Sequence, residues 1–228
     1  MHRSFLIAII LLVGVVSHAN AITILSTDFD GRTVAGSTAS NLTWVTNGVS
    51  DPGALTADTN PDGLFDTAHA QDRFAVDRNL HNEGTWSVDI DLAVGASAIN
   101  LNTVQLDAFI FNNAGDLQGV GRQLSMTVDL RDAGLNFITG TTIEDIYIHD
   151  EPGLAQPKTF AFGVPAALSA NTNYVIRVTA FGQGPGNNSG IDNLIVDGDI
   201  VVNPVPEPAT AGLAILGIAG VALRRKRC

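Results

Sequence analysis

The chain has 228 residues, a formal net charge of −11 and a single cysteine, Cys228, at its last position. Between residues 22 and 208, seven Lys and Arg oppose all twenty-three Asp and Glu, so this part carries a net charge of −16. Nucleic acid is therefore not expected as a partner, because phosphate groups are bound by clustered basic residues. Disulfide bonds are also excluded from residues 22–208, because this part of the chain contains no cysteine.

The first 21 residues are typical of a secretory signal peptide. A basic residue, Arg3, precedes an apolar stretch at residues 5–16, and the small residues Ala19-Asn20-Ala21 follow at the distance of a cleavage site. A core helix or an N-terminal anchor is the alternative. We predict an exported protein whose mature chain begins at Ile22.

The mature region alternates short β-type runs with turns that are rich in Gly, Asn, Asp and Pro. Every second residue is apolar in residues 86–92 and again in residues 123–131, which is typical of strands with one buried face. We expect these side chains to point into the core: Trp86, Val88, Ile90, Leu92, Leu124, Met126, Val128 and Leu130. Further strands are predicted at residues 22–29, 104–111, 143–149, 159–164, 174–181 and 191–202.

About eight strands without a convincing helix predict an all-β domain, an antiparallel β-sandwich of jelly-roll type, with a barrel as the alternative. The domain is placed at residues 22–202. Trp86 follows the core alternation, whereas the sequence leaves open whether Trp44 is buried or exposed.

The least regular stretch, residues 50–83, contains a candidate calcium loop. Oxygen-bearing side chains stand at positions one, three, five and nine of residues 58–66, and Gly63 at position six permits a sharp turn. Over these nine residues the chain resembles the calcium loops of dockerins and EF-hands, although position twelve is His69 rather than Glu. The alternative is a metal-free turn held by side-chain hydrogen bonds. The predicted calcium ligands in this loop are Asp58, Asn60, Asp62 and Asp66.

The sequence contains no nucleophile elbow, zinc-protease motif or glycine-rich phosphate loop, so no catalytic residue is predicted. Asp89 and Asp91 share one strand face and have the composition of a glycosidase carboxylate pair. The alternative, that they only make an outer face soluble, is the one we favour.

The two ends of the domain carry a second set of candidate calcium ligands. The first strand ends in Asp28-Phe29-Asp30, and the last begins with residues 190–194. The closing run, residues 186–198, resembles the last strand of jelly-roll carbohydrate-binding modules. In that family the first and last strands pair, and the resemblance implies calcium held by Asp192 with Asp28 or Asp30. The alternative is that Asp192 caps a turn.

The tail has three parts in order: a Pro206-Glu207-Pro208 triplet, an uncharged apolar run at residues 209–223, and a basic cluster. The cluster consists of Arg224, Arg225, Lys226 and Arg227. This order resembles the PEP-CTERM sorting signal of secreted proteins in Gram-negative bacteria. The resemblance implies that residues 209–228 are a transmembrane helix and basic tail that anchor the protein transiently in the inner membrane, and that an exosortase-type transpeptidase removes this segment.

These observations together predict four segments: a signal peptide at residues 1–21, the β-sandwich, a linker with the sorting motif at residues 203–208, and the anchor. The sandwich is interpreted as non-catalytic, with a structural or adhesive role at the cell surface or in an exopolysaccharide matrix. Polysaccharide is the ligand class that the resemblance to carbohydrate-binding modules implies. The alternative is a secreted hydrolase that acts on polysaccharide.

Overall fold

The computed structural model describes residues 21–29, 33–35, 38–58, 85–111, 123–147, 158–181 and 188–202. All regular structure in these ranges is β-strand: β1 (Ile22–Thr27), β2 (Thr33–Ala35), β3 (Thr38–Ser40), β4 (Val45–Thr46), β5 (Leu55–Asp58), β6 (Trp86–Ala93), β7 (Ile99–Phe111), β8 (Gln123–Asp132), β9 (Phe137–Tyr147), β10 (Lys158–Leu168), β11 (Asn173–Phe181) and β12 (Asn188–Ile200). The predicted signal peptide up to Asn20, the linker and the anchor lie outside the described residues. The described ranges contain no helix that is long and apolar enough to cross a membrane.

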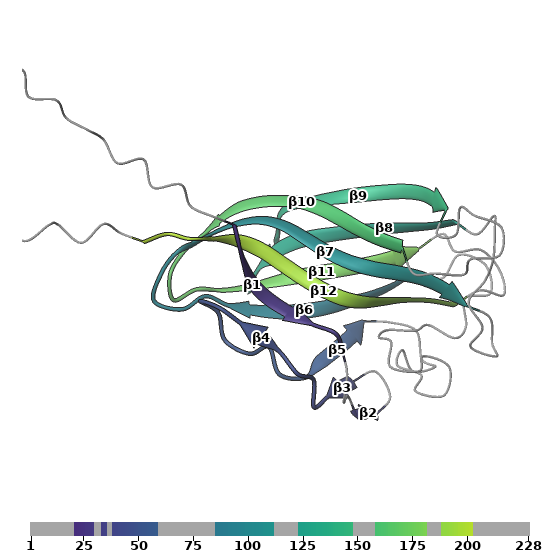
Figure 1. Cartoon of the computed structure of the whole chain (residues 1–228), viewed down its shortest axis with the longest axis horizontal. Coiled ribbons are helices and arrows are strands. Elements are labelled where there is room, and N and C mark those ends of the chain that lie inside the picture. The colour runs from purple at the N-terminus through teal and green to yellow at the C-terminus, as the bar shows by residue number, and fades with distance from the viewer. Residues whose placement is uncertain are drawn as a thin grey trace, which may run out of the picture.

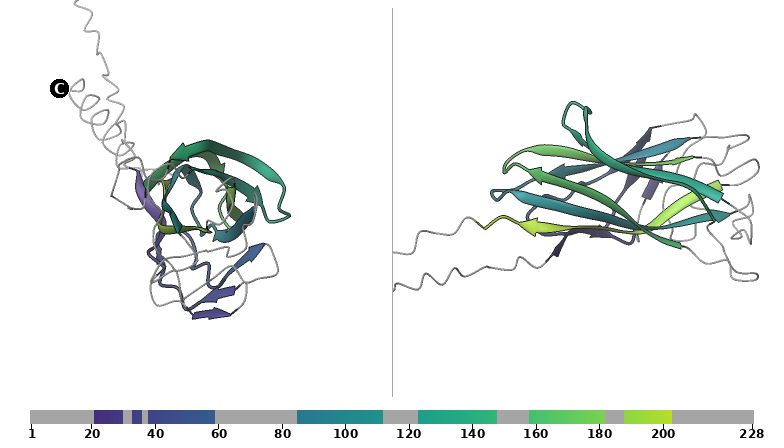
Figure 2. Two further views of the ribbon diagram at one scale, coloured as in Figure 1. Left: turned by 90° about the vertical axis from the view of Figure 1, so that its right-hand side faces the viewer. Right: turned by 90° about the horizontal axis from the view of Figure 1, so that it is seen from above.

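The strands form two antiparallel sheets that face each other across a core (Figure 1). One sheet has five strands in the order β10-β7-β12-β1-β4, and the other has seven in the order β2-β3-β5-β6-β11-β8-β9. At one edge the sheets meet, because β9 packs beside β10 and the Thr141 hydroxyl donates a hydrogen bond to the Gly163 carbonyl. Figure 2 (left) gives the view along the strands. The predicted all-β sandwich is confirmed.

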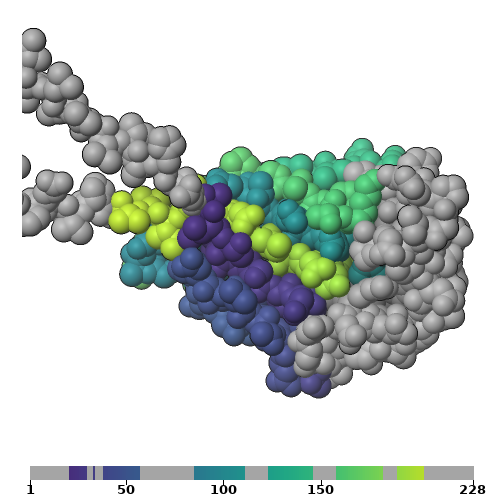
Figure 3. Space-filling model, viewed as in Figure 1, coloured from purple at the N-terminus to yellow at the C-terminus, as the bar shows by residue number. Residues whose placement is uncertain are grey.

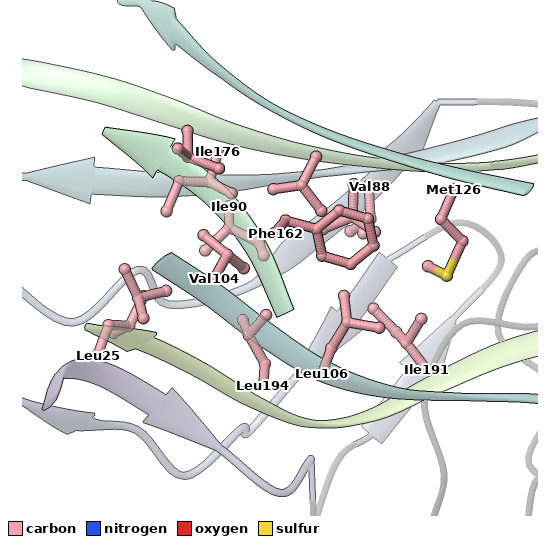
Figure 4. Close-up of a cluster of buried hydrophobic side chains, with 14 of the residues drawn as sticks. Leu25, Val88, Ile90, Val104, Leu106, Met126, Phe162, Ile176, Ile191 and Leu194 are labelled. Carbon is pink, nitrogen blue, oxygen red and sulfur yellow. The ribbon is translucent and has the colours of Figure 1, made fainter. Parts of the chain in front are cut away.

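The predicted inward-facing residues form the core. On β6, Trp86, Val88, Ile90 and Leu92 are completely buried, and the alternating apolar residues of β8 are at most 3% exposed. They pack against apolar side chains of the opposite sheet (Figure 4), namely Leu25, Val104, Leu106, Phe162, Ile191 and Leu194. The indole nitrogen of Trp86 donates a 2.8 Å hydrogen bond to the buried Ser189 hydroxyl, so its one polar atom is satisfied inside the core.

The first and last strands pair, as the sequence predicted. β1 runs antiparallel to β12, with Ile22 opposite Gly198 and Thr27 opposite Leu194. The space-filling view shows β1, in purple, lying along β12, in yellow (Figure 3). Since the strands are antiparallel, β1 begins at the same end of the molecule at which β12 finishes.

Several elements differ from their predicted extents. The short strands β2 to β5 were not predicted, and both β7 and β9 begin several residues earlier than expected. The four short strands have two to four residues each, which is too few for an alternating pattern to be recognised. They follow β1 in the chain and extend both sheets: β4 lies beside β1, and β5, β3 and β2 continue the other sheet outward from β6 in that order.

Candidate functional site

The outer face of the seven-stranded sheet carries two ion pairs. Arg177 on β11 lies opposite Asp89 on β6 and opposite Asp129 on β8. Its guanidinium donates two hydrogen bonds of 2.6 Å to the Asp89 carboxylate. The Asp89 carboxylate is therefore held in a bidentate ion pair, the geometry that fixes both side chains most firmly.

A second pair extends this row across β8. Arg131 donates to both carboxylate oxygens of Asp129, at 3.0 and 2.8 Å. This hydrogen bonding raises the pKa of Arg131 above its ordinary value. Only 6% of Asp129 is exposed, and a carboxylate buried to this degree requires a partner. The two ion pairs form a rigid polar surface in which each arginine is matched by a carboxylate.

One end of this face is hollowed. The hollow, called the end hollow below, has a volume of about 350 Å³ and lies where β6 ends and β11 begins. The connection between β4 and β5 and the turn between β8 and β9 complete its wall. Its lining residues are Asp51, Pro52, Asp91, Leu92, Ala93, Ala133, Asn173, Tyr174 and Val175.

The end hollow combines hydrogen-bonding groups with apolar surface. Its carboxylates are Asp51, which accepts a 2.6 Å hydrogen bond from the Gly53 amide, and the exposed Asp91. Asn173 adds an amide that both donates and accepts. Tyr174 contributes a ring whose hydroxyl accepts a 3.0 Å hydrogen bond from the Ser169 amide, which fixes its position. A concave site with some apolar area and a few fixed polar groups is the usual form of a small-ligand site.

Of the predicted end-strand calcium ligands, the structure describes Asp28 and Asp192. Asp28 and Asn193 line a separate hollow of about 240 Å³ between β1 and β12. Asp192 lies opposite Asp107 of β7, and one of its oxygens accepts a 2.9 Å hydrogen bond from the Asn193 amide. The side-chain amide of Asn193 donates to Asp107 at 2.8 Å.

No group of three His, Cys, Asp or Glu side chains suited to a metal ion is found in the described part of the chain. The other predicted calcium ligands are largely outside that part. Asp58 ends β5, whereas Asp30, Asn60, Asp62 and Asp66 lie outside the described residues. The sorting residues Pro206, Glu207 and Pro208 and the basic cluster at residues 224–227 also lie outside them.

Sequence reasoning identified some residues of this face and missed others. It placed Asp89 and Asp91 on one outer face, but it did not identify Arg177, Arg131 or Asp129 as their neighbours. The two-residue period of each strand could have identified them. Each of the missed residues is adjacent in sequence to a core residue and therefore faces the outer side of the sheet. Trp44, which the sequence left open, is half-buried; its indole donates a 3.2 Å hydrogen bond to the Gly53 carbonyl, and its ring meets that of Phe29 edge-on at 6.4 Å.

The comparison with family models decides the nature of the tail. Residues 204–227 match the model of the PEP-CTERM protein-sorting motif. The chain carries a PEP-CTERM motif. The motif indicates export with transient membrane anchoring, and it implies processing by an exosortase. No curated protein matches the chain.

Solved structures that are similar to the chain include carbohydrate-binding β-sandwiches. One is TmCBM61 in complex with beta-1,4-galactotriose, with 13% identity, a TM-score of 0.37, and coverage of 75% of this chain and 90% of that one. Another belongs to a study of promiscuous carbohydrate-binding modules of the β-sandwich superfamily, with 7% identity, a TM-score of 0.29, and coverage of 82% and 87%. A putative glycoside hydrolase from Bacteroides thetaiotaomicron has 9% identity, a TM-score of 0.27, and coverage of 82% and 98%. Similarity at this level carries no argument about the ligand of this chain.

Proposed function

We propose that this is an exported, exosortase-processed protein whose β-sandwich binds polysaccharide outside the cell without cleaving it, in a structural or adhesive role in an exopolysaccharide matrix. The observation that carries the proposal is the end hollow, in which two carboxylates, an amide, a tyrosine ring and a proline line one concavity. Sugar hydroxyls need both donors and acceptors, and the faces of sugar rings pack on apolar or aromatic surface. The PEP-CTERM motif supports the extracellular location.

The arrangement of charge supports binding by shape and hydrogen bonds rather than by bulk electrostatics. The guanidinium groups of Arg131 and Arg177 are both engaged by carboxylates on the same face. The −16 net charge of residues 22–208 also opposes polyanions. Neutral polysaccharides are therefore the preferred ligands in this proposal.

A glycan array followed by affinity electrophoresis tests the proposal. We expect neutral polysaccharide to retard the purified protein, and Asp91→Ala and Asn173→Ala each to weaken binding about fivefold to tenfold, the effect of losing one or two hydrogen bonds. Gln105→Ala is the matched control, because Gln105 is a half-buried polar residue on the five-stranded sheet. Binding that is lost equally in the control, or absent from every glycan, would contradict the proposal.

A hydrolase is the second candidate, and one observation favours it: Asp51 and Asp91 line the same hollow, and glycosidases act through two facing carboxylates. The same preparations decide between the two functions. Reducing ends that are released by the wild-type protein and not by Asp51→Asn or Asp91→Asn would establish the hydrolase. Binding without release would establish the binding module.

Calcium binding remains a prediction. If the end-strand residues hold the ion, a hundredfold excess of calcium over Kd should stabilise the fold by about 2.7 kcal/mol. That energy corresponds to a rise in melting temperature of about 5–10 °C for a domain of this size. Asp192→Ala should remove the shift, whereas Asp197→Ala on the same strand should retain it. Loss of the shift in Asp62→Ala would place the ion in residues 58–66 instead. A melting curve unaffected by calcium and by chelator would reject both sites.

A further inference from the structure

The turn between β8 and β9, together with the first two residues of β9, presents three large apolar side chains to solvent. Leu135 is 45% exposed, Phe137 63% and Ile138 43%. We call these three residues the apolar tip. In the described part of the chain the only other large apolar residues with comparable exposure are Val45 and Val202, so most of this surface lies within four consecutive positions. Exposed apolar groups that are concentrated in one place indicate an interaction surface.

Hydrogen bonds hold the backbone of the apolar tip in place. One carboxylate oxygen of Asp132 accepts hydrogen bonds from the amides of Gly134 and Asn136, at 2.8 and 3.0 Å. The Leu135 amide donates to the Asp132 carbonyl at 2.9 Å, and the Leu135 carbonyl accepts from Arg131 at 3.1 Å. The turn therefore places its apolar side chains outward while few of its polar groups need water. Such a segment enters an apolar environment at low cost.

The apolar tip lies at the end of the molecule from which the membrane anchor departs. Asp132, at its base, is opposite Tyr174 near the start of β11. Further hydrogen bonds continue along the same end, from Val94 to Thr172 and from Val201 to Ala98. In Figure 2 (right) the turn stands clear of the strands, in the half of the molecule in which β12 finishes.

The linker between the domain and the apolar run of the tail is short. Val202 is the last described residue, and six residues, 203–208, separate it from the apolar run of the PEP-CTERM segment, which begins at residue 209. Six residues span at most about 20 Å. While the anchor is inserted, the end of the domain that carries the apolar tip is therefore confined close to the bilayer surface.

We propose that the apolar tip inserts into the interfacial layer of the membrane while the anchor is in place, and so orients the domain on the bilayer. Aromatic and aliphatic side chains partition into this layer. Asp132 and Arg131 limit the insertion to a shallow depth, because both are charged and lie at the base of the turn. Because the domain carries a net negative charge, a surface of anionic lipid would repel it. The proposed partner is therefore a zwitterionic lipid surface.

Tryptophan fluorescence in vesicles tests this proposal. The full chain is reconstituted in phosphatidylcholine vesicles, either plain or brominated on the acyl chains, because bromine quenches tryptophan that lies within the bilayer. We expect the tryptophan added by Phe137→Trp to be quenched about threefold more than that added by Glu144→Trp. Glu144 is an exposed residue on the same strand, seven positions further from the tip, and the background from Trp44 and Trp86 is common to both variants.

A further variant separates insertion of the tip from mere tethering by the anchor. Adding Leu135→Ser and Ile138→Ser to Phe137→Trp should reduce the quenching to the level of the Glu144→Trp control. Equal quenching in Phe137→Trp and Glu144→Trp would overturn the proposal, and so would quenching that survives the two serines. Equal melting temperatures show that the variants are folded. The outcome does not depend on polysaccharide binding, so this proposal and the proposed function fail separately.

Discussion

Replacing Val88 with Asn is expected to cost about 3–5 kcal/mol of folding free energy, a large part of the stability of an ordinary domain. Val88 is completely buried on β6, where it lies opposite Val178 of β11. The asparagine amide would lose its hydrogen bonds to water and find only apolar neighbours, and the contacts of the valine methyl groups would also be lost. Urea denaturation followed by tryptophan fluorescence measures the effect as a shift of the midpoint at constant slope.

Ser87→Asn is the matched control, because it introduces the same side chain one residue earlier on the same strand. Ser87 is half-buried on the other face of the sheet, where it lies opposite Thr179. The polar side chain remains in contact with water there, so we expect a cost below about 0.5 kcal/mol. Equal costs for the two substitutions would show that the observed register of β6 is wrong.

Gly198→Ala is expected to destabilise the domain by more than about 3 kcal/mol. Gly198 lies on β12, and a Cβ atom at this position would overlap the carbonyl oxygen of Asn100 and the Cδ1 atom of Ile24. The isoleucine can rotate, but the carbonyl belongs to the backbone of the neighbouring strand β7, which cannot retreat without breaking its own pairing. The added methyl group therefore forces a shift of the sheet.

Gly163→Ala provides the comparison for this prediction. Gly163 lies within β10, and no heavy atom lies within 4 Å of a Cβ added there. Because glycine in a strand is costly in backbone entropy, alanine should be neutral or stabilising by up to about 0.5 kcal/mol. Thermal denaturation of both variants checks the contrast. A Gly198→Ala protein that melts with the wild type would show that β7 and β12 are not so closely spaced.

The fold could be predicted from the sequence where the chain repeats a strong local pattern. Trp86 to Leu92 alternates without exception, so burial on one face followed directly from the residue order. The long strands β7 and β12 were also predicted, although not with their exact ends. The short strands escaped prediction because their pairing with β1, β3 and β6 defines them, and pairing is a property of the tertiary structure.

The candidate site could be predicted only in part. Asp89 was assigned to an outer face, but its partner Arg177 is 88 residues away, and only the register of β11 against β6 brings them together. The end hollow draws its wall from four separate parts of the chain, including Asp51 and Ala133, neither of which belongs to a recognisable motif. The apolar tip was missed because Leu135, Phe137 and Ile138 read as ordinary core residues until the turn places them outside.

The position of β12 has a mechanical consequence. This strand leads to the anchor, and within the five-stranded sheet it is flanked on both sides, by β7 and by β1. The hydrogen bonds between antiparallel strands run perpendicular to the strands. A pull on the anchored tail therefore acts along β12 and loads both ladders in shear, with many bonds sharing the tension at once, instead of unzipping an edge strand bond by bond. The domain is thus attached to its tail through a strand that is paired on both sides and resists this load along its whole length.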